Sequence, residues 1–294
     1  MLNTIERLEI FLKDEGISAN VLSRSLERVS SATLSQFRAG KYKGDNKDVA
    51  DKINRYIDNY YEKKLKKEQS PLNEIKNEIV ETRDFTMGSY VIDEAVDECE
   101  LGLIYGLPGT GKTTILEEYA KTHPNAVLIK TNRFYKAKTL LDRICAELGI
   151  ESVGDNAAKL DKIVKFLKQS DRILLIDEAE NLPIQALDGL RFIWMESEKP
   201  MVLAGTELLK DKLIGSGGEL RRFYNRICNV YMMKGLSESE SIAIYGTDLI
   251  YKYCENDFRA SSKLYKKAYK AARFKNKEID SELINDALTM VLIK

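Results

Sequence analysis

The stretch GLPGTGKTT, residues 106–114, has the residue types and the spacing of a phosphate-binding loop. Its glycines allow backbone N–H groups to turn toward an anion, and the start of the next helix adds positive potential. Lys112 would neutralise β- and γ-phosphate charge, and the hydroxyl of Thr113 suits Mg²⁺. We therefore predict that ATP and Mg²⁺ bind here. The predicted nucleotide ligands are Gly106, Pro108, Gly109, Thr110, Gly111, Lys112, Thr113 and Thr114.

A pair of acids follows another apolar run, in ILLIDE at residues 173–178. The run predicts a buried strand, so Asp177 emerges at its carboxyl end, where α/β sheets place their ligands. We expect Asp177 to hold Mg²⁺ together with Thr113, and Glu178 to orient or deprotonate the attacking water. An acidic strand end that caps the next helix is the alternative. A glutamate at this position favours a hydrolase over a nucleotide kinase.

The elements that must carry these residues follow from the hydrophobic pattern. From about residue 77, strand-like runs alternate with helical ones; the runs are LGLIYG, AVLIKT, RILLIDE, PMVLAGT and ICNVYMM. This alternation predicts the α/β fold class with a parallel, doubly wound sheet. The phosphate loop then has a strand before it and a helix after it, which is the context that the motif requires. That context disfavours a chance glycine-rich turn.

Sequence texture divides the chain into four regions. Residues 1–62 contain only short helical patterns and predict a small all-α domain. Residues 63–76 are charged, contain a Ser-Pro pair, and indicate a linker or an exposed helix end. The strand-containing core covers residues 77–236, and residues 237–294 are helical throughout.

Composition excludes some classes of protein. The 294 residues include 46 basic and 46 acidic side chains, so any nucleic-acid surface must come from local clustering. No apolar run approaches the ~20 residues that cross a bilayer. The N-terminus lacks a signal-peptide core, and the four cysteines include no CxxC pair. We expect a cytoplasmic protein with reduced thiols and no membrane partner.

Polar residues near the last two strands complete the predicted site. Thr206 ends PMVLAGT and is expected to reach the γ-phosphate or the attacking water, a role compatible with capping the next helix. A basic cluster, RRFYNR, precedes ICNVYMM. This order of motifs resembles the AAA+ ATPases over about residues 77–294. The resemblance implies that Arg226, or as second choice Arg222, reaches the nucleotide of a neighbouring subunit.

The helical region from residue 237 would then be the AAA+ lid. Its segment NDFRASSKLYKKAYKAAR is similar to the lid helix with the family's second sensor arginine, which implies that Arg259 contacts the nucleotide. Ordinary surface positions are the alternative for each of these arginines. The resemblance thus implies an AAA+ P-loop NTPase with a helical lid, preceded by the small all-α domain.

Residues 19–45 predict two short helices of the repressor helix-turn-helix type, the second capped by Ser30 or Ser31. A structural helical hairpin is the alternative, because the turn carries Glu27-Arg28 where glycine is common. The side chains predicted to face a core are Val21, Leu22, Leu26, Val29, Leu34 and Phe37. The side chains predicted to contact DNA are Ser35, Gln36, Arg38, Lys41 and Lys43.

A repressor-like domain followed by a small AAA+ module resembles the phage Mu transposition protein B family. Insertion-sequence helper ATPases and the ATPases of Tn7-like elements are relatives through the AAA+ part. The resemblance implies a bacterial or phage-encoded ATPase that binds double-stranded DNA with little sequence preference. It further implies that the protein oligomerises on target DNA as a filament or ring and delivers that DNA to a transposase. ATP hydrolysis would drive disassembly.

Further DNA contacts are predicted in KTNRFYKAK, residues 130–138, where phosphate donors gather at one helix start. A charged surface helix is the alternative. The donors predicted here are Thr131, Asn132, Arg133, Lys136 and Lys138.

Two other functions compete with the transposition helper. A transcriptional regulator would read an operator with its helix-turn-helix and use the ATPase fold only to sense nucleotide. A replication initiator or loader shares the AAA+ core, but such proteins usually place their DNA-reading domain after the lid.

Overall fold

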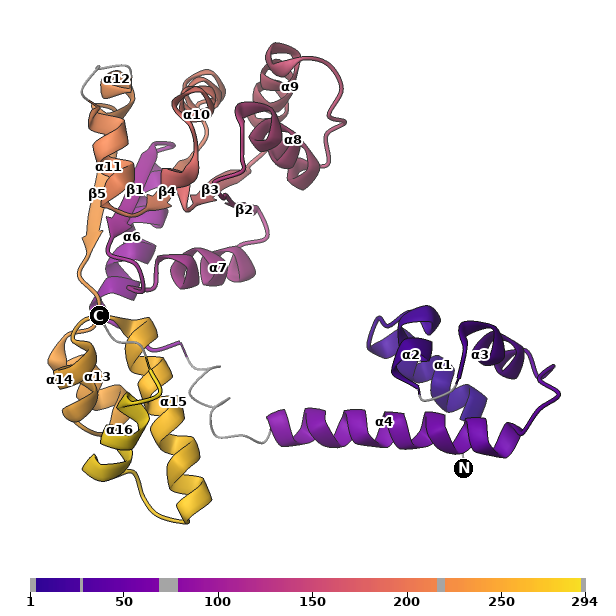
Figure 1. Cartoon of the computed structure of the whole chain (residues 1–294). Helices are drawn as coiled ribbons and strands as arrows, with labels where there is room; N and C mark the ends of the chain where they lie inside the picture. Colours follow the sequence, from indigo (N-terminus) through magenta and orange to yellow (C-terminus); the bar gives the residue numbers. More distant parts are fainter. Residues whose placement is uncertain (1–3, 27–28, 69–78, 216–219, 292–294) are drawn as a thin grey trace. The chain divides into compact units, whose positions relative to one another are not determined.

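A computed structural model describes residues 4–26, 29–68, 79–215 and 220–291 (Figure 1). The chain divides into two compact units after Ile79. Among the described residues, no helix combines the length and the apolar composition that crossing a membrane requires.

The first unit is all helical, with α1 (Thr4–Asp14), α2 (Ala19–Ser25), α3 (Ser31–Arg38) and α4 (Asn46–Glu68). Its core contains most of the side chains predicted to face inward, with the addition of apolar residues from α1 and α4. The buried core residues are Leu8, Phe11, Leu22, Leu26, Val29, Leu34, Phe37, Val49, Ile53 and Ile57.

In this unit, one predicted core residue is wrong and one predicted helix cap is confirmed. Val21 is 54% exposed, so its predicted place in the core is wrong. Neighbouring residues of a helix point about 100° apart, and in α2 it is Leu22 that faces inward. Ser30 caps α3 as predicted, because its hydroxyl accepts a hydrogen bond from the Thr33 N–H at 3.1 Å. The predicted linker at 63–76 begins inside α4, and its remainder from residue 69 lies outside the described residues, as does the Glu27-Arg28 turn.

The second unit is built on a parallel sheet of five strands. These are β1 (Leu101–Gly106), β2 (Ala126–Lys130), β3 (Ile173–Asp177), β4 (Met201–Gly205) and β5 (Ile227–Met233), in the order β2-β3-β4-β1-β5. All five predicted strands and their parallel pairing are therefore confirmed. The phosphate loop leaves the carboxyl end of β1 between β4 and β5.

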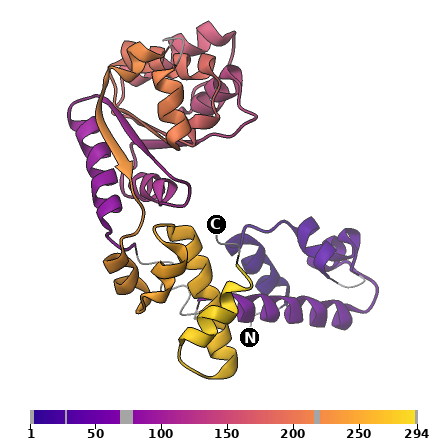
Figure 2. The same cartoon turned by 60° about the vertical axis from the view of Figure 1, so that its left-hand side comes forward.

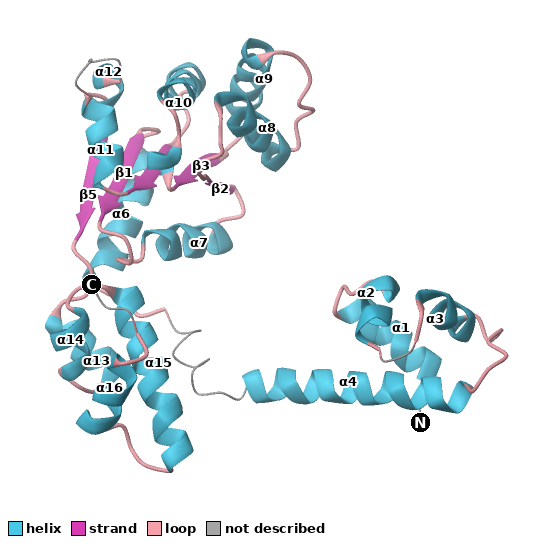
Figure 3. Cartoon of the chain, in the orientation of Figure 1, coloured by secondary structure: helices cyan, strands magenta, loops and turns pink. Residues whose placement is uncertain are grey.

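Helices cover both faces of the sheet (Figure 3). Successive side chains of a strand point to opposite faces, so each strand presents apolar side chains to the helices on both sides. Leu101 and Leu103 pack on one face of β1, and Ile104 packs on the other. On the Ile104 face lie α6 (Arg83–Asp97), which runs beside β5 (Figure 2), and α7 (Lys112–Thr122). The opposite face is covered by α8 (Ala137–Leu148), α9 (Asn156–Lys168), α10 (Ile184–Ser197) and α11 (Glu207–Ile214).

A helical region follows β5 and has a small core of its own. It consists of α13 (Glu238–Tyr245), α14 (Leu249–Cys254), α15 (Phe258–Lys275) and α16 (Ser281–Leu288). Ser237 and Glu240 form a reciprocal capping box at the start of α13, as their spacing predicts. Glu240 also accepts a hydrogen bond from the Arg83 N–H at 2.7 Å, which ties this region to the start of α6.

Candidate nucleotide-binding site

The phosphate loop requires glycine where it leaves β1. Gly106 has a φ of +153°, and a Cβ there would lie 2.5 Å from the backbone oxygen of Met233 in β5. Because that oxygen belongs to the backbone of a paired strand, it cannot move aside. Gly111 has a φ of +106° and begins α7, so the helix N-terminus points at the loop.

Lys112 lies inside the loop. Its Nζ donates hydrogen bonds to the backbone oxygens of Gly106 at 2.8 Å and Leu107 at 2.7 Å. Burial lowers the pKa of Lys112, while the carboxylates of Glu180 and Asp177 act in the opposite direction. The amine is therefore placed at the centre of the loop, close to two anions.

Thr113 and Asp177 meet as the sequence predicts for a Mg²⁺ site. The Thr113 hydroxyl donates to Asp177 Oδ2 at 2.8 Å, and the Glu178 N–H donates to Asp177 Oδ1 at 2.9 Å. Asp177 is 2% exposed, and this burial raises the pKa of its carboxyl. A hydroxyl beside a carboxylate matches the hard oxygen ligands that Mg²⁺ prefers, so the residues present fit the ion.

Glu178 directly follows Asp177 in a constrained conformation. Its φ is +54°, in the left-handed region that non-glycine residues rarely adopt. Its Oε2 accepts a hydrogen bond from Asn181 Nδ2 at 3.0 Å, and Asn181 belongs to the short helix η1 (Ala179–Asn181). The side chain is exposed and lines the pocket, so water can reach it.

Two buried polar atoms near the end of β4 have no hydrogen-bond partner among the described residues. They are Thr206 Oγ1 and Glu180 Oε2. Thr206 precedes α11, but its hydroxyl makes no capping hydrogen bond, so the capping role is not used. Buried polar groups normally have partners, and the Thr206 hydroxyl lies where a polar ligand would supply one.

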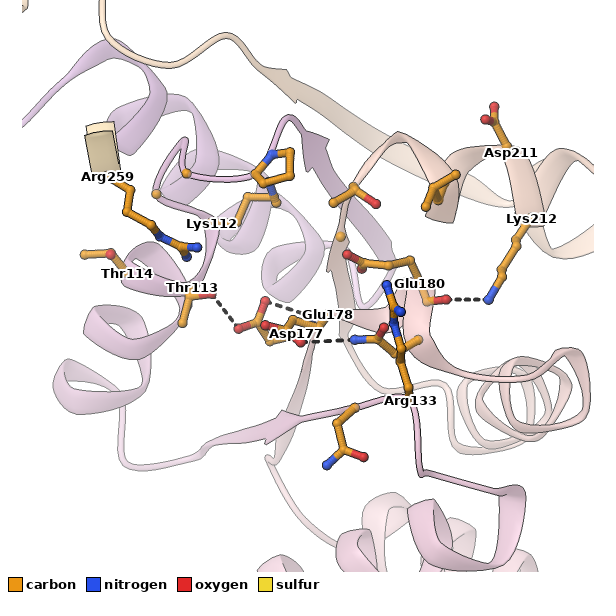
Figure 4. Close-up of a pocket in the computed structure, with 18 of the residues that line it drawn as sticks. Lys112, Thr113, Thr114, Arg133, Asp177, Glu178, Glu180, Asp211, Lys212 and Arg259 are labelled. Atoms are coloured by element: carbon orange, nitrogen blue, oxygen red, sulfur yellow. Dashed lines mark hydrogen bonds between the residues drawn. The ribbon is translucent and has the colours of Figure 1, made fainter. Parts of the chain in front are cut away.

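One cavity of about 1470 Å³ joins these groups (Figure 4). It is large enough for a nucleotide. Of the predicted nucleotide and catalytic residues, those that line it are Pro108, Gly109, Gly111, Lys112, Thr113, Thr114, Asp177, Glu178, Thr206 and Arg259. Thr110 is buried instead, and its hydroxyl donates to the Leu107 oxygen at 2.9 Å, which shapes the loop from within.

Comparison with known proteins agrees with this geometry. A family model described as an AAA domain matches residues 96–213. The ORC2 protein of Aeropyrum pernix, solved in its ADPNP–ADP complexes, has the same fold with a TM-score of 0.55 and 14% identity. The match covers 73% of this chain and 69% of that one. The chain has the AAA+ P-loop fold and is an ATPase.

Two relatives in sequence are named for transposition. Mu-like prophage FluMu DNA transposition protein B of Haemophilus influenzae is 25% identical over 251 residues, which are 83% of this chain and 84% of the relative. ATP-dependent target DNA activator B of Escherichia phage Mu is 25% identical over 203 residues, which are 68% of this chain. That match spans slightly less than two thirds of the phage protein, 63%. The predicted resemblance to this family is confirmed.

The helical region after β5 reaches the phosphate loop through the start of α15. The Arg259 N–H donates to the Gly109 oxygen at 3.3 Å, and the Arg259 side chain points into the pocket (Figure 4). Asp257 caps α15 and packs against Gly109, where a side chain on residue 109 would collide with its carboxylate.

Of the two arginines predicted to act in a neighbouring subunit, Arg226 lies away from this pocket. Arg226 is exposed between α12 (Arg221–Tyr224) and β5, and it does not line the cavity. The side chain of Arg222 lies outside the described residues. The role of either arginine at a neighbouring subunit stays a prediction.

The residues after β2 that are predicted to contact DNA lie in three different surroundings. Thr131 is 3% exposed, and its hydroxyl donates to the backbone oxygens of Asp177 at 3.0 Å and Glu178 at 2.8 Å. This corrects its predicted DNA contact, because the hydroxyl is committed to holding the end of β3. Asn132 and Arg133 line the nucleotide pocket. Lys136 and Lys138 are exposed at the start of α8.

In the first unit, four of the predicted DNA-contacting residues are exposed, and Arg38, whose side chain is 35% exposed, has a partner within the unit. Ser35, Gln36, Lys41 and Lys43 are exposed. The Arg38 guanidinium instead donates two hydrogen bonds to the Glu9 carboxylate, at 2.6 and 2.8 Å, so it is occupied within the unit.

Sequence reasoning missed several residues of the pocket. Glu180 and Asn181 stand in IDEAEN, directly after the predicted acids, and that proximity was an available signal. No sequence signal indicated Lys212, because a lysine in an amphipathic helix resembles an ordinary surface residue. Its Nζ donates to the backbone oxygens of Glu180 and Leu182, which holds η1 against α11.

Proposed function

We propose that the protein is an ATP-dependent DNA-binding ATPase of a DNA transposition system. In this proposal it assembles on duplex target DNA with little sequence preference and delivers that DNA to a transposase or activates the transposase. Hydrolysis of ATP then drives disassembly. The observation that carries the proposal is an AAA+ nucleotide pocket in a chain similar to a target DNA activator and to a transposition protein. The phage and prophage origin of these relatives supports a cytoplasmic location.

ATP would bind with its phosphates in the loop around Lys112, whose charge faces β- and γ-phosphates. Mg²⁺, when bound, offsets phosphate charge, and Thr113 and Asp177 would hold it. The Thr206 hydroxyl has no hydrogen-bond partner within the described ranges and is available to the γ-phosphate or the attacking water. Glu178 would accept the proton of that water as its oxygen bonds to the γ-phosphorus and the bond to ADP breaks.

Assembly would complete the site, since Arg226 is exposed and lies outside its own pocket. An arginine contributed by a neighbour stabilises charge in phosphoryl transfer and is worth about 10³- to 10⁵-fold in rate. Arg259 lines the pocket of its own chain and would contact the nucleotide from the lid. Hydrolysis would then depend on assembly along DNA, which makes it DNA-stimulated.

DNA contacts would come from both units. Lys136 and Lys138 are exposed beside the segment that lines the pocket. In the first unit, Gln36 is exposed on α3, and Lys41 and Lys43 follow it. These lysines suit phosphates, which carry no sequence information and therefore give nonspecific binding.

DNA binding, nucleotide binding and the lid would belong to separate regions, with the boundaries predicted from composition and hydrophobic pattern. Residues 1–62 would bind DNA, residues 77–236 would bind nucleotide, and residues 237–294 would form the lid. The division of the chain into compact units after Ile79 and the capping box at Ser237 support these boundaries.

Electron microscopy of the full chain with random duplex DNA, with and without ATP, tests the proposal. We expect continuous coating of the DNA only with ATP, and none with a Lys112→Ala variant, which loses the cation of the loop. Discrete particles at rare sites, indifferent to ATP, would favour a helix-turn-helix transcriptional regulator with a nucleotide-sensing domain.

A further inference from the structure

The pocket contains a third carboxylate to which none of the roles above applies. Glu180 lies in η1, three residues after Asp177, and lines the cavity together with Lys112. Its Oε2 is buried and has no hydrogen-bond partner among the described residues. Burying a carboxylate oxygen without a hydrogen-bond partner costs free energy, so a functional reason for its position is expected.

The position of Glu180 is determined from two sides. A Cβ on Gly205 would lie 2.5 Å from Glu180 Oε2, so the glycine at the end of β4 leaves the space that the carboxylate fills. Gly205 pairs with Tyr105, the last residue before the phosphate loop begins. On the other side, Lys212 binds the backbone oxygen of Glu180. Figure 4 shows the side chain extending from the Lys212 side of the pocket toward Lys112.

The charge of Glu180 acts on the residue that must receive the γ-phosphate. Burial lowers the pKa of Lys112, and the carboxylates of Glu180 and Asp177 oppose this effect. Asp177 accepts hydrogen bonds from Thr113 and from the Glu178 N–H, whereas Glu180 Oε2 accepts none from the described part of the chain. A phosphate oxygen is also only an acceptor, so it cannot satisfy Glu180. A γ-phosphate beside Lys112 would therefore meet a like charge, and like charges at close range repel each other.

We propose that Glu180 sets the selectivity of the site between ATP and ADP, because its carboxylate opposes the γ-phosphate beside Lys112. ADP lacks that group and escapes the repulsion. The triphosphate state then requires further positive charge, and Arg133 and Arg259 line the same pocket. Tight ATP binding is thereby linked to the cations that line the site. This inference rests on the proposed binding of ATP.

Equilibrium binding of fluorescent ADP and of a fluorescent, non-hydrolysable ATP analogue to the full chain with Mg²⁺ tests the inference. Glu180→Gln keeps the size of the side chain and removes its charge. We expect the ratio of Kd for ADP to Kd for the ATP analogue to rise about tenfold, which is about 1.4 kcal/mol. Unchanged ADP affinity would show that the variant is folded. Glu180→Ala should shift the ratio in the same direction.

Glu207→Gln is the matched control. Glu207 is an exposed acid that follows Thr206 in α11, where solvent screens its charge, so the ratio should stay within about twofold of wild type. A ratio in Glu180→Gln equal to or below that of wild type would overturn the inference, even if wild-type protein binds nucleotide and hydrolyses ATP. Wild-type protein that binds neither nucleotide would instead overturn the proposed function.

Discussion

Replacing Glu178 with glutamine isolates the basicity of the carboxylate from its position. The Asn181 Nδ2 donates to Glu178 Oε2 at 3.0 Å, and a glutamine oxygen can accept the same hydrogen bond. The Glu178 N–H bond to Asp177 is a backbone contact and is unaffected. Both side chains bear a Cβ, so the left-handed backbone, with a φ of +54°, is equally strained in each. The variant should therefore fold and bind nucleotide as wild type does.

The size of the effect follows from the loss of a general base. Such a group contributes about 10²- to 10⁴-fold in rate. Because the Glu178 side chain is exposed, solvent water can replace part of its function, and we expect a loss of about 10²- to 10³-fold. That range corresponds to about 2.7 to 4.1 kcal/mol in activation free energy.

The assay is phosphate release at saturating ATP with Mg²⁺ and duplex DNA, alongside equilibrium binding of nucleotide and DNA. Glu178→Gln should lose turnover, keep nucleotide affinity within about twofold, and leave assemblies on DNA that persist. Glu207→Gln, which removes an exposed acid outside the pocket, should behave as wild type. A kcat for Glu178→Gln within threefold of wild type would refute the assignment, as would a loss of turnover explained by lost nucleotide binding.

Three further outcomes follow from the contacts. Asp84 is 4% exposed and accepts hydrogen bonds from the Tyr231 hydroxyl at 2.7 Å and the Gly235 N–H at 2.6 Å. Asp84→Asn should therefore lower the free energy of unfolding by about 2 to 4 kcal/mol in urea titrations. A change below about 0.5 kcal/mol would contradict this. Burial and the Asp84 hydrogen bond raise the pKa of Tyr231 from 10.0 to about 12, so its stabilising contribution is present below pH 10 and lost as pH rises toward 12. Tyr231→Phe should therefore lose less stability than wild type across that window in unfolding measured at stepped pH. Replacing Lys136 and Lys138 with alanine should reduce the slope of log K for DNA against log salt by about one for each lost phosphate contact, and an unchanged slope would place the DNA elsewhere.

Local sequence was sufficient to predict the sheet and the phosphate loop. Short apolar runs with turn signals between them are consistent with buried strands, and all five strands lie where these runs stand. The phosphate loop is similarly local, because its glycines, Lys112 and Thr113 lie within eight positions of one strand–turn–helix unit. Asp177 could be predicted because parallel strands bring their carboxyl ends to one edge.

Roles that depend on distant partners could not be predicted in this way. Thr131 was predicted to contact DNA, yet its hydroxyl binds the end of β3, 46 and 47 positions along the chain. Arg38 was assigned to a DNA groove, yet it pairs with Glu9, 29 positions away. A polar side chain satisfies its hydrogen bonds with whatever the fold brings near, and a single sequence does not reveal those neighbours.

The sequence by itself thus determined which strands form, where the phosphates would bind and which acid accompanies Thr113. These depend on hydrophobic period and on backbone conformations that neighbouring residues dictate. Only the tertiary structure decided that Glu180 fills the space left by Gly205 in the pocket that holds Lys112, and that Arg133 lines this pocket. The groups around Glu180 and Arg133 come from segments that meet only when β1, β2, β3 and β4 lie side by side. The electrostatic environment of a charge depends on distance in space and not on separation along the chain.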